Sequence, residues 1–262
     1  MISQKANNIS VISHRGRCYS KYPDTKESSL EAFANVFLNG INFVETDLWS
    51  TKDKEMILNH DPKINVYDKI LITDSIYKNI KSFSFGLRKR QIRYPWRRNN
   101  NVITLKMLLE KFPLMKVNLE LKSLTNRGIT NFEKLWIREL AALIIVGNYS
   151  NSFVISSFNW DLVDYMNNYL PNIRKGYLLE KNRVNEVFER TDNNSVYSVH
   201  PHYTVVDDDF MKKSINRNLK VFTWTVNKKE EIISMINFQV NGIITDYPLL
   251  AKKILEEYNF NN

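Results

Sequence analysis

Residues 43–49 read FVETDLW, an apolar run broken only by Glu45, Thr46 and Asp47. Such a run is typical of a strand that is buried on both faces, as in a parallel sheet. Side chains at positions i and i+2 of a strand point to the same face, so Glu45 and Asp47 share one face. Two buried carboxylates repel and lose hydration unless a cation lies between them. The stretch therefore predicts a parallel sheet and a cation site on it.

Seven similar apolar runs alternate with helical patterns along the rest of the chain, which predicts an α/β fold with a TIM (β/α)8 barrel. A barrel of this kind takes roughly 250 residues, and the chain has 262. We therefore expect a single domain over residues 1–262. The predicted strands are residues 9–14, 43–49, 116–121, 153–157, 175–179, 196–200, 220–225 and 242–245. Helical segments include residues 28–38, 105–111, 132–145, 160–168, 207–215, 228–237 and 249–258.

The connection after the second strand is longer than a barrel needs. We expect a short extra strand at residues 54–58 that leads to His60, followed by a small insertion at about residues 62–101. The segment from Leu87 to Arg98 (LRKRQIRYPWRR) is rich in Lys and Arg and has no acidic residue. A net charge of +9 and this segment favour an anionic partner, either a phosphate ester or an anionic membrane surface. A solvated surface is the more ordinary explanation of a charge run, and we do not expect nucleic acid as a partner.

The cysteine content and the pattern of apolar residues indicate the cellular compartment. Cys18 is the only cysteine, so no intrachain disulfide can form. The N-terminal residues are polar and resemble no signal peptide, and no apolar run approaches the roughly 20 residues of a membrane span. We therefore expect a soluble, cytoplasmic protein.

Polar residues follow the predicted strands, at the end of a TIM barrel where active sites lie. The first strand ends in His14-Arg15-Gly16, the third in Glu120-Leu121-Lys122, the sixth in His200-Pro201-His202, and the seventh runs into Trp224. His60-Asp61 follows the extra strand. We expect these residues to gather at one mouth of the barrel.

Three carboxylates, Glu45, Asp47 and Glu120, are the candidate metal ligands. Oxygen ligands favour a hard divalent cation, Mg²⁺ or Ca²⁺. The alternative is a structural network in which these acids pair with Arg15 and Lys122.

His14 and His60 are the candidate acid and base, because imidazole titrates near neutral pH. Arg15 and Lys122 offer fixed positive charge to a phosphate group. Trp224 is a candidate contact for the organic part of a substrate, or else a rim residue of the core. His200 and His202 are candidates for supporting contacts, and Ser156 and Ser157 for hydrogen bonding.

The order of these motifs resembles the glycerophosphodiester phosphodiesterase family. The motifs are His14-Arg15-Gly16, Glu27-Ser28-Ser29, Glu45-Thr46-Asp47, His60-Asp61, Glu120-Leu121-Lys122, Trp224-Thr225-Val226-Asn227 and Thr245-Asp246-Tyr247-Pro248. The resemblance implies a TIM barrel with an insertion after strand two. It also implies a divalent cation on the three carboxylates, His14 and His60 as acid–base pair, and Arg15 and Lys122 on the phosphate. The implied reaction yields glycerol 3-phosphate and an alcohol, with lipid and glycerol metabolism as its setting.

This sequence departs from the family pattern at Glu27-Ser28-Ser29, where Glu-Asn-Thr is usual, and in its basic insertion. These departures affect the expected substrate more than the expected chemistry. One alternative is lysophospholipase D activity at a membrane surface. Another is a non-catalytic barrel that binds phosphoesters or nucleic acid through the basic segment.

Overall fold

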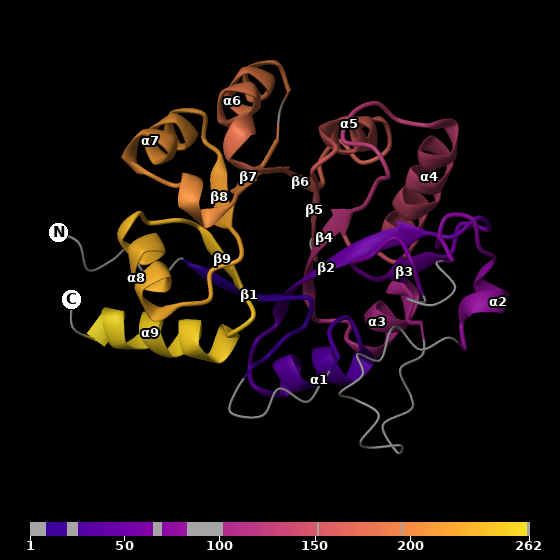
Figure 1. Ribbon diagram of the computed structural model, residues 1–262, viewed down its shortest axis with the longest axis horizontal. Helices are drawn as coiled ribbons and strands as arrows, with labels where there is room; N and C mark the ends of the chain where they lie inside the picture. The colour runs from indigo at the N-terminus through magenta and orange to yellow at the C-terminus, as the bar shows by residue number, and fades with distance from the viewer. Residues whose placement is uncertain are drawn as a thin grey trace.

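A closed ring of eight parallel strands forms the centre of the computed structural model, which describes residues 9–19, 26–64, 70–82, 102–150, 152–194 and 196–260. Helices surround the strands (Figure 1). The ring closes because β1 pairs with both β2 and β9. The parallel strands are β1 (Ser10–His14), β2 (Phe43–Ser50), β4 (Lys116–Leu121), β5 (Phe153–Ser157), β6 (Arg174–Leu179), β7 (Ser198–Pro201), β8 (Lys220–Thr223) and β9 (Gly242–Thr245). The predicted TIM barrel is confirmed.

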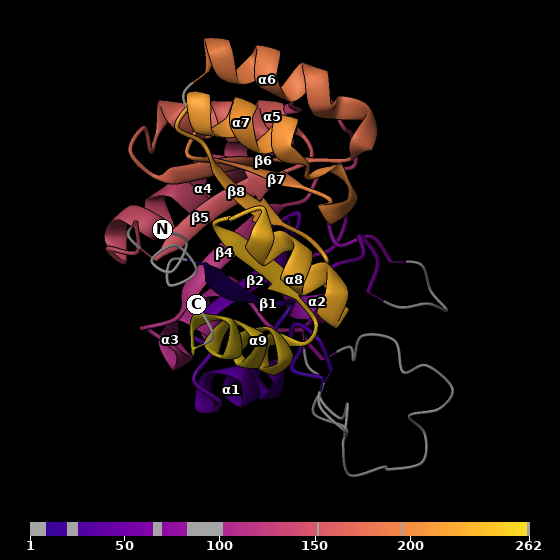
Figure 2. The ribbon, with the colours of Figure 1, turned by 90° about the vertical axis from the view of Figure 1, so that its left-hand side faces the viewer.

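The helices lie outside the barrel, and α6 and α7 are on the opposite side from α1 and α9 (Figure 2). Each predicted helical segment is found, most of them with shifted ends, and the segment at 160–168 divides into α5 and a 3₁₀ turn, η4. The helices are α1 (Leu30–Leu38), α2 (Tyr77–Ile80), α3 (Leu105–Lys111), α4 (Asn131–Val146), α5 (Trp160–Tyr165), α6 (Val184–Asn193), α7 (Asp208–Asn216), α8 (Lys229–Asn237) and α9 (Pro248–Phe260), with 3₁₀ turns η4 (Met166–Asn168), η5 (Lys181–Arg183) and η6 (Tyr203–Val205).

Side chains in the sequence fix several helix starts. Ser29 and Thr104 each accept a backbone N–H of the first turn, at 3.1 Å from Ala32 and 3.2 Å from Met107. Thr130 and Glu133 form a reciprocal capping box at the start of α4. Such caps satisfy backbone donors that a helix leaves unpaired at its start.

A short antiparallel strand, β3 (Met56–Leu58), pairs with β2 and confirms the expected extra strand. The chain therefore turns back toward the mouth of the barrel and delivers His60 there. Ile64, Ile72 and Ile80, in the insertion that follows His60, pack together in a small apolar cluster. The basic segment from Leu87 to Arg98 lies outside the described residues.

The core has two regions. The larger one lies between the outer faces of the strands and the helices. The smaller one fills part of the barrel interior with Ile12, Val154, Phe222 and Ile244. Among the described helices none is long and apolar enough to cross a bilayer.

Candidate active site

Three carboxylates converge at the mouth of the barrel. Glu45 and Asp47 lie on β2 and Glu120 lies on β4, and the register pairs Asp47 with Glu120. One oxygen from each carboxylate lies within 4.8 Å of the other two, and all three residues are buried. Adjacent strands and the two-residue repeat therefore bring the predicted ligands together.

Burial and mutual repulsion disfavour charge on two of these acids. Burial raises the pKa of Glu45 well above its ordinary value, and the charges of Asp47 and Glu120 raise it further. Burial also raises the pKa of Glu120, to about 7, although Lys122 opposes this shift. The cluster therefore holds carboxylates whose ionised form needs a nearby cation.

Two basic side chains already contact the cluster. Lys122 Nζ lies 2.8 Å from Asp47 Oδ1 and also contacts Glu120, and Arg15 Nε lies 3.1 Å from Asp47 Oδ2. Burial raises the pKa of Asp47, but Lys122 and Arg15 outweigh burial and the net shift is downward. The ion network that the sequence left open is thus present, and it centres on Asp47.

The three carboxylates also fit a divalent cation. Oxygens that share an ion at 2.0–2.6 Å lie at most about 5 Å apart, as these do. Two basic residues do not balance three carboxylates, and Glu45 contacts neither basic side chain among the described ion pairs. The donor set therefore suits a hard cation beside the network.

His14 ends β1 and stands over Glu45. Its Nδ1 lies 2.7 Å from Asp246 Oδ1, and its Nε2 lies 3.9 Å from Glu45 Oε2. Burial lowers the pKa of His14, while the hydrogen bond to Asp246 opposes that shift. His14 therefore presents Nε2 toward the carboxylate cluster.

His60 follows β3, lines the same site and is more exposed than His14. Its Nδ1 lies 2.9 Å from Asp61 Oδ1. Partial burial lowers the pKa of His60, and the charge of Asp47 opposes the shift. Both histidines line one pocket of about 130 Å³, together with Glu45, Glu120 and Lys122.

Sequence comparison identifies the family of this barrel. A family model described as the glycerophosphoryl diester phosphodiesterase family matches residues 14–250. The chain belongs to this family. The match runs from His14 past Asp246, so all the site residues above lie inside it, and the chain is an enzyme of the phosphodiesterase class.

Individual proteins that are similar to this chain have phosphodiesterase or lysophospholipase D names. A glycerophosphodiester phosphodiesterase of Caldanaerobacter subterraneus subsp. tengcongensis is 28% identical over 91% of this chain and 94% of its own. Human lysophospholipase D GDPD3 is 20% identical over 88% of this chain and 81% of its own. An Oleispira antarctica phosphodiesterase, solved in complex with the product sn-glycerol-3-phosphate, superposes with a TM-score of 0.80 at 20% identity, over 96% and 98% of the two chains.

Trp224, the third predicted substrate contact, lines the same pocket as the two histidines. Its indole Nε1 donates to the carbonyl of His200 at 2.8 Å, and its ring meets the edge of Phe158 at 5.5 Å between centroids. These two contacts hold the ring in place at the pocket.

A wider groove of about 700 Å³ adjoins this pocket. The two cavities share His60, Glu120, Lys122 and Phe158. The groove continues past Asn159 and Arg183 over the loops that follow β4, β5 and β6. A phosphodiester centred near His60 can therefore extend one arm into the small pocket and the other into the groove.

Sequence reasoning did not assign a role to Asp246. This residue follows β9 and accepts hydrogen bonds from His14 and, at 2.9 Å, from Arg17; its other oxygen accepts from Asn227 at 2.9 Å. Burial raises the pKa of Asp246, but His14 and Arg17 outweigh burial and the net shift is downward. The signal was present in the sequence as the Thr245-Asp246 motif at a strand end.

Three of the remaining predicted polar residues make other contacts. His202 hydrogen bonds with Thr204 at 2.8 Å and packs against the Trp224 ring. Ser157 donates to the carbonyl of Leu121 at 2.7 Å, as expected of a hydrogen-bonding residue. His200 is fully buried inside the barrel and does not reach the mouth.

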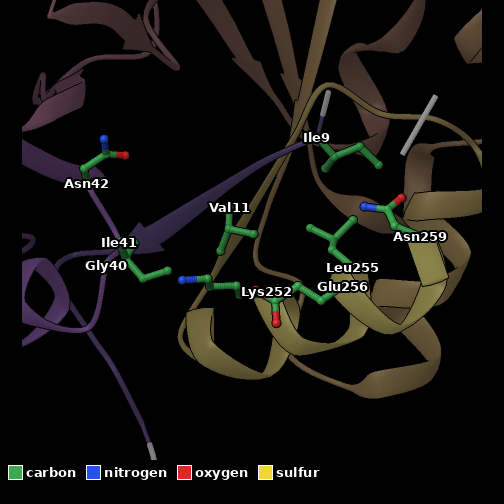
Figure 3. Close-up of a pocket in the computed structure, with 9 residues that line it drawn as sticks. All are labelled: Ile9, Val11, Gly40, Ile41, Asn42, Lys252, Leu255, Glu256 and Asn259. Carbon is green, nitrogen blue, oxygen red and sulfur yellow. The ribbon is translucent and has the colours of Figure 1, made fainter. Parts of the chain in front are cut away.

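Another cavity, of about 260 Å³, lies at the opposite end of β1 (Figure 3). Val11, Leu255 and Ile9 form its apolar wall, and Lys252 extends across it toward Gly40. This cavity lacks the paired histidines and converging carboxylates of the barrel mouth.

Proposed function

We propose that this enzyme hydrolyses glycerophosphodiesters to glycerol 3-phosphate and an alcohol, with His14 and His60 as the acid–base pair. Glu45, Asp47 and Glu120 hold the divalent cation, Mg²⁺ or Ca²⁺, in this proposal. The observation that carries it is that both histidines line one small pocket with Glu45 and Glu120 of the carboxylate cluster. The sn-glycerol-3-phosphate in the Oleispira antarctica relative supports the product.

When bound, the cation neutralises charge on the phosphoryl oxygens. Arg15 and Lys122 lie beside the same cluster and can each donate to a phosphoryl oxygen. Lys122 keeps its proton, because Glu120 and Asp47 raise its pKa against the effect of burial. These two side chains therefore orient the phosphate and hold it between the histidines.

Each histidine transfers a proton at Nε2, because its Nδ1 is engaged by a carboxylate. One histidine accepts the proton of the attacking oxygen, which is water or the neighbouring glycerol hydroxyl. As the phosphorus–oxygen bond to the alcohol breaks, the other histidine protonates the leaving oxygen. Attack by the hydroxyl passes through a cyclic phosphate that water then opens with the two roles exchanged: the histidine that gave its proton to the alcohol accepts one from water, and the other returns its proton to the glycerol oxygen.

Two further residues position these groups. Asp246 fixes the orientation of His14 through the 2.7 Å hydrogen bond. Trp224 presents its ring to the small pocket, where it can cover the carbon chain of the glycerol part.

A panel of substrates with different metals tests this proposal. Glycerophosphocholine and glycerophosphoethanolamine are incubated with the enzyme in Mg²⁺, Ca²⁺ or EDTA, and glycerol 3-phosphate is measured. The proposal predicts product with at least one of the two metals and none in EDTA. Undiminished turnover in EDTA would remove the metal from the proposal.

A second candidate function is hydrolysis of lysolipids by lysophospholipase D chemistry. It is favoured by the 700 Å³ groove beside the pocket and by the name of the human relative. The two functions differ in substrate and share one site. Comparing rates on soluble diesters with rates on lysolipid vesicles, with and without anionic lipid, distinguishes them.

We also propose a cytoplasmic location and a small-molecule phosphodiester as the partner. A lone, buried cysteine supports a reducing compartment. Cell fractionation tests the location.

A further inference from the structure

Beneath the active-site pocket, one wall of the barrel interior is polar. Asn118, Ser156 and His200 are each fully buried there. Within the part of the chain that the structure describes, both amide atoms of Asn118, the hydroxyl of Ser156 and Nδ1 of His200 have no hydrogen-bond partner. Buried polar groups are nearly always hydrogen-bonded, so these atoms indicate a missing ligand or water.

Strand register brings this wall to the pocket. Asn118 lies two residues before Glu120 on β4 and opposite Glu45 on β2, so it shares the inner face with both. Ser156 lies opposite Glu120 on β5. Asn118 itself lines the pocket that holds His14 and His60. It is the point where the active site meets the polar wall.

A glycine makes room for the histidine in this wall. Gly176 lies opposite Ser156 and next to Ser198 on β7. A Cβ atom at Gly176 would lie 2.4 Å from His200 Nε2, so only glycine leaves space for the imidazole. The Nε2 atom of His200 is hydrogen-bonded with Ser198 at 2.8 Å, and burial lowers the pKa of His200 to about 3. The ring is therefore neutral and offers Nδ1 as one further hydrogen-bonding atom.

The chemistry of these four atoms selects a class of ligand. Asn118 offers a donor and an acceptor, and Ser156 can act as either. Of the three residues, Asn118 is the one that lines the pocket. An anion there would face the acceptor of Asn118 and the nearby carboxylates, and an apolar group would leave both amide atoms of Asn118 unpaired. Hydroxyl groups both donate and accept, so they suit the wall.

We propose that Asn118 recognises the free hydroxyl groups of the glycerol part of the substrate, and that Ser156 and His200 form the polar wall behind it. This inference rests on the proposed function, because the phosphate must lie between His14 and His60 for the glycerol to reach Asn118. Asn118 is then a specificity residue that distinguishes polyol phosphodiesters from simple alkyl phosphodiesters.

Inhibition of the native enzyme gives the first test. The probes are sn-glycerol 3-phosphate and n-propyl phosphate, which share the phosphate and the three-carbon chain and differ in hydroxyl groups. We expect glycerol 3-phosphate to bind about 10-fold to 100-fold more tightly, which is the penalty for leaving one buried polar group unpaired. Equal inhibition constants would overturn the proposal and leave only buried water in the wall.

Variants test whether the polar wall of Asn118, Ser156 and His200 causes the preference for glycerol 3-phosphate. Asn118→Leu keeps the approximate volume and removes both amide atoms, and we expect the ratio of the two inhibition constants to fall toward one. Ser156→Ala is the milder variant, with a smaller fall, and keeps the test usable if Asn118→Leu does not fold. Thr223→Val is the matched control. Thr223 also has a buried, unpaired hydroxyl among the described residues. It follows the inward-facing Phe222, so its side chain points away from the barrel interior and from the polar wall. We expect no change of ratio in the control.

The outcomes separate this inference from the proposed function. An enzyme that hydrolyses no diester with any metal contradicts the proposed function. An active enzyme whose Asn118→Leu and Ser156→Ala variants keep the native preference contradicts the role of Asn118 alone. In that case the hydroxyl groups are recognised elsewhere in the pocket.

Discussion

The contact between His14 and Asp246 leads to a sharp prediction for Asp246→Asn. Both oxygens of this carboxylate act as acceptors, Oδ1 from His14 and Arg17 and Oδ2 from Asn227. An amide keeps one acceptor and gains a donor. Whichever way the new amide turns, its N–H group meets another donor, either at Asn227 or at His14 and Arg17.

The magnitude follows from the lost hydrogen bond. A hydrogen bond to a charged group contributes roughly 1.5–3 kcal/mol, and 1.4 kcal/mol corresponds to about tenfold. We therefore expect kcat to fall about 10-fold to 150-fold, because His14 is no longer held with Nε2 toward the substrate. KM should change little, since Asp246 does not line the pocket that receives the substrate.

The pH profile distinguishes positioning from a general loss of structure. Asp246 raises the pKa of His14 against the effect of burial. Its removal should therefore lower that pKa, and the limb of the kcat profile that reports His14 should move to lower pH. The assay is release of glycerol 3-phosphate from glycerophosphocholine across pH, with thermal unfolding as the control for folding. A folded variant with native kcat and an unshifted profile would refute the reasoning.

Two further predictions concern the metal cluster and the polar wall. Metal affinity, measured by calorimetry, should rise with pH through about 7, because bound metal requires the ionised forms of Glu120, whose pKa is about 7, and of Glu45, whose pKa is also raised. By the same raised pKa, the metal-free protein should lose stability as pH rises from the ordinary glutamate pKa of 4.5 to about 7. Glu120→Gln should reduce this loss, since Glu45 still contributes to it, and should weaken metal binding about tenfold or more; unchanged affinity would exclude Glu120 as a ligand. Gly176→Ala should lower the free energy of unfolding by about 1–3 kcal/mol, because its Cβ meets His200. His200→Ala in the same chain should reduce that effect, and additive losses in denaturant melts would contradict the contact.

The strands could be predicted from sequence within about two residues because each is a short apolar run with a clear polar end. β4, β5 and β9 begin and end where the pattern predicts. Helix α6 is not predicted from the sequence, because its apolar face is limited to Val184, Val187 and Phe188 in an otherwise polar stretch. These three residues pack in the apolar core of the barrel.

The site was predictable where it depends on local pattern. Glu45 and Asp47 share a face by the strand repeat alone, and a TIM barrel places His14 and Glu120 at one mouth. The role of Asp246 was not predictable in this way, because it depends on closure of the ring by β1 and β9. Lys122 contacts both Asp47 and Glu120, and this pair of contacts likewise requires the register of β2 and β4.

The paired histidines are the centre of the proposed chemistry. The most direct test measures turnover of glycerophosphocholine by His14→Ala and His60→Ala at saturating metal, with metal-induced thermal stabilisation as the control for a folded, metal-binding site. Acid–base catalysis contributes about 10²-fold to 10⁴-fold, so each variant should lose activity by that factor while it keeps the stabilisation. A folded variant of either histidine with turnover within tenfold of the native enzyme would contradict the proposed acid–base pair.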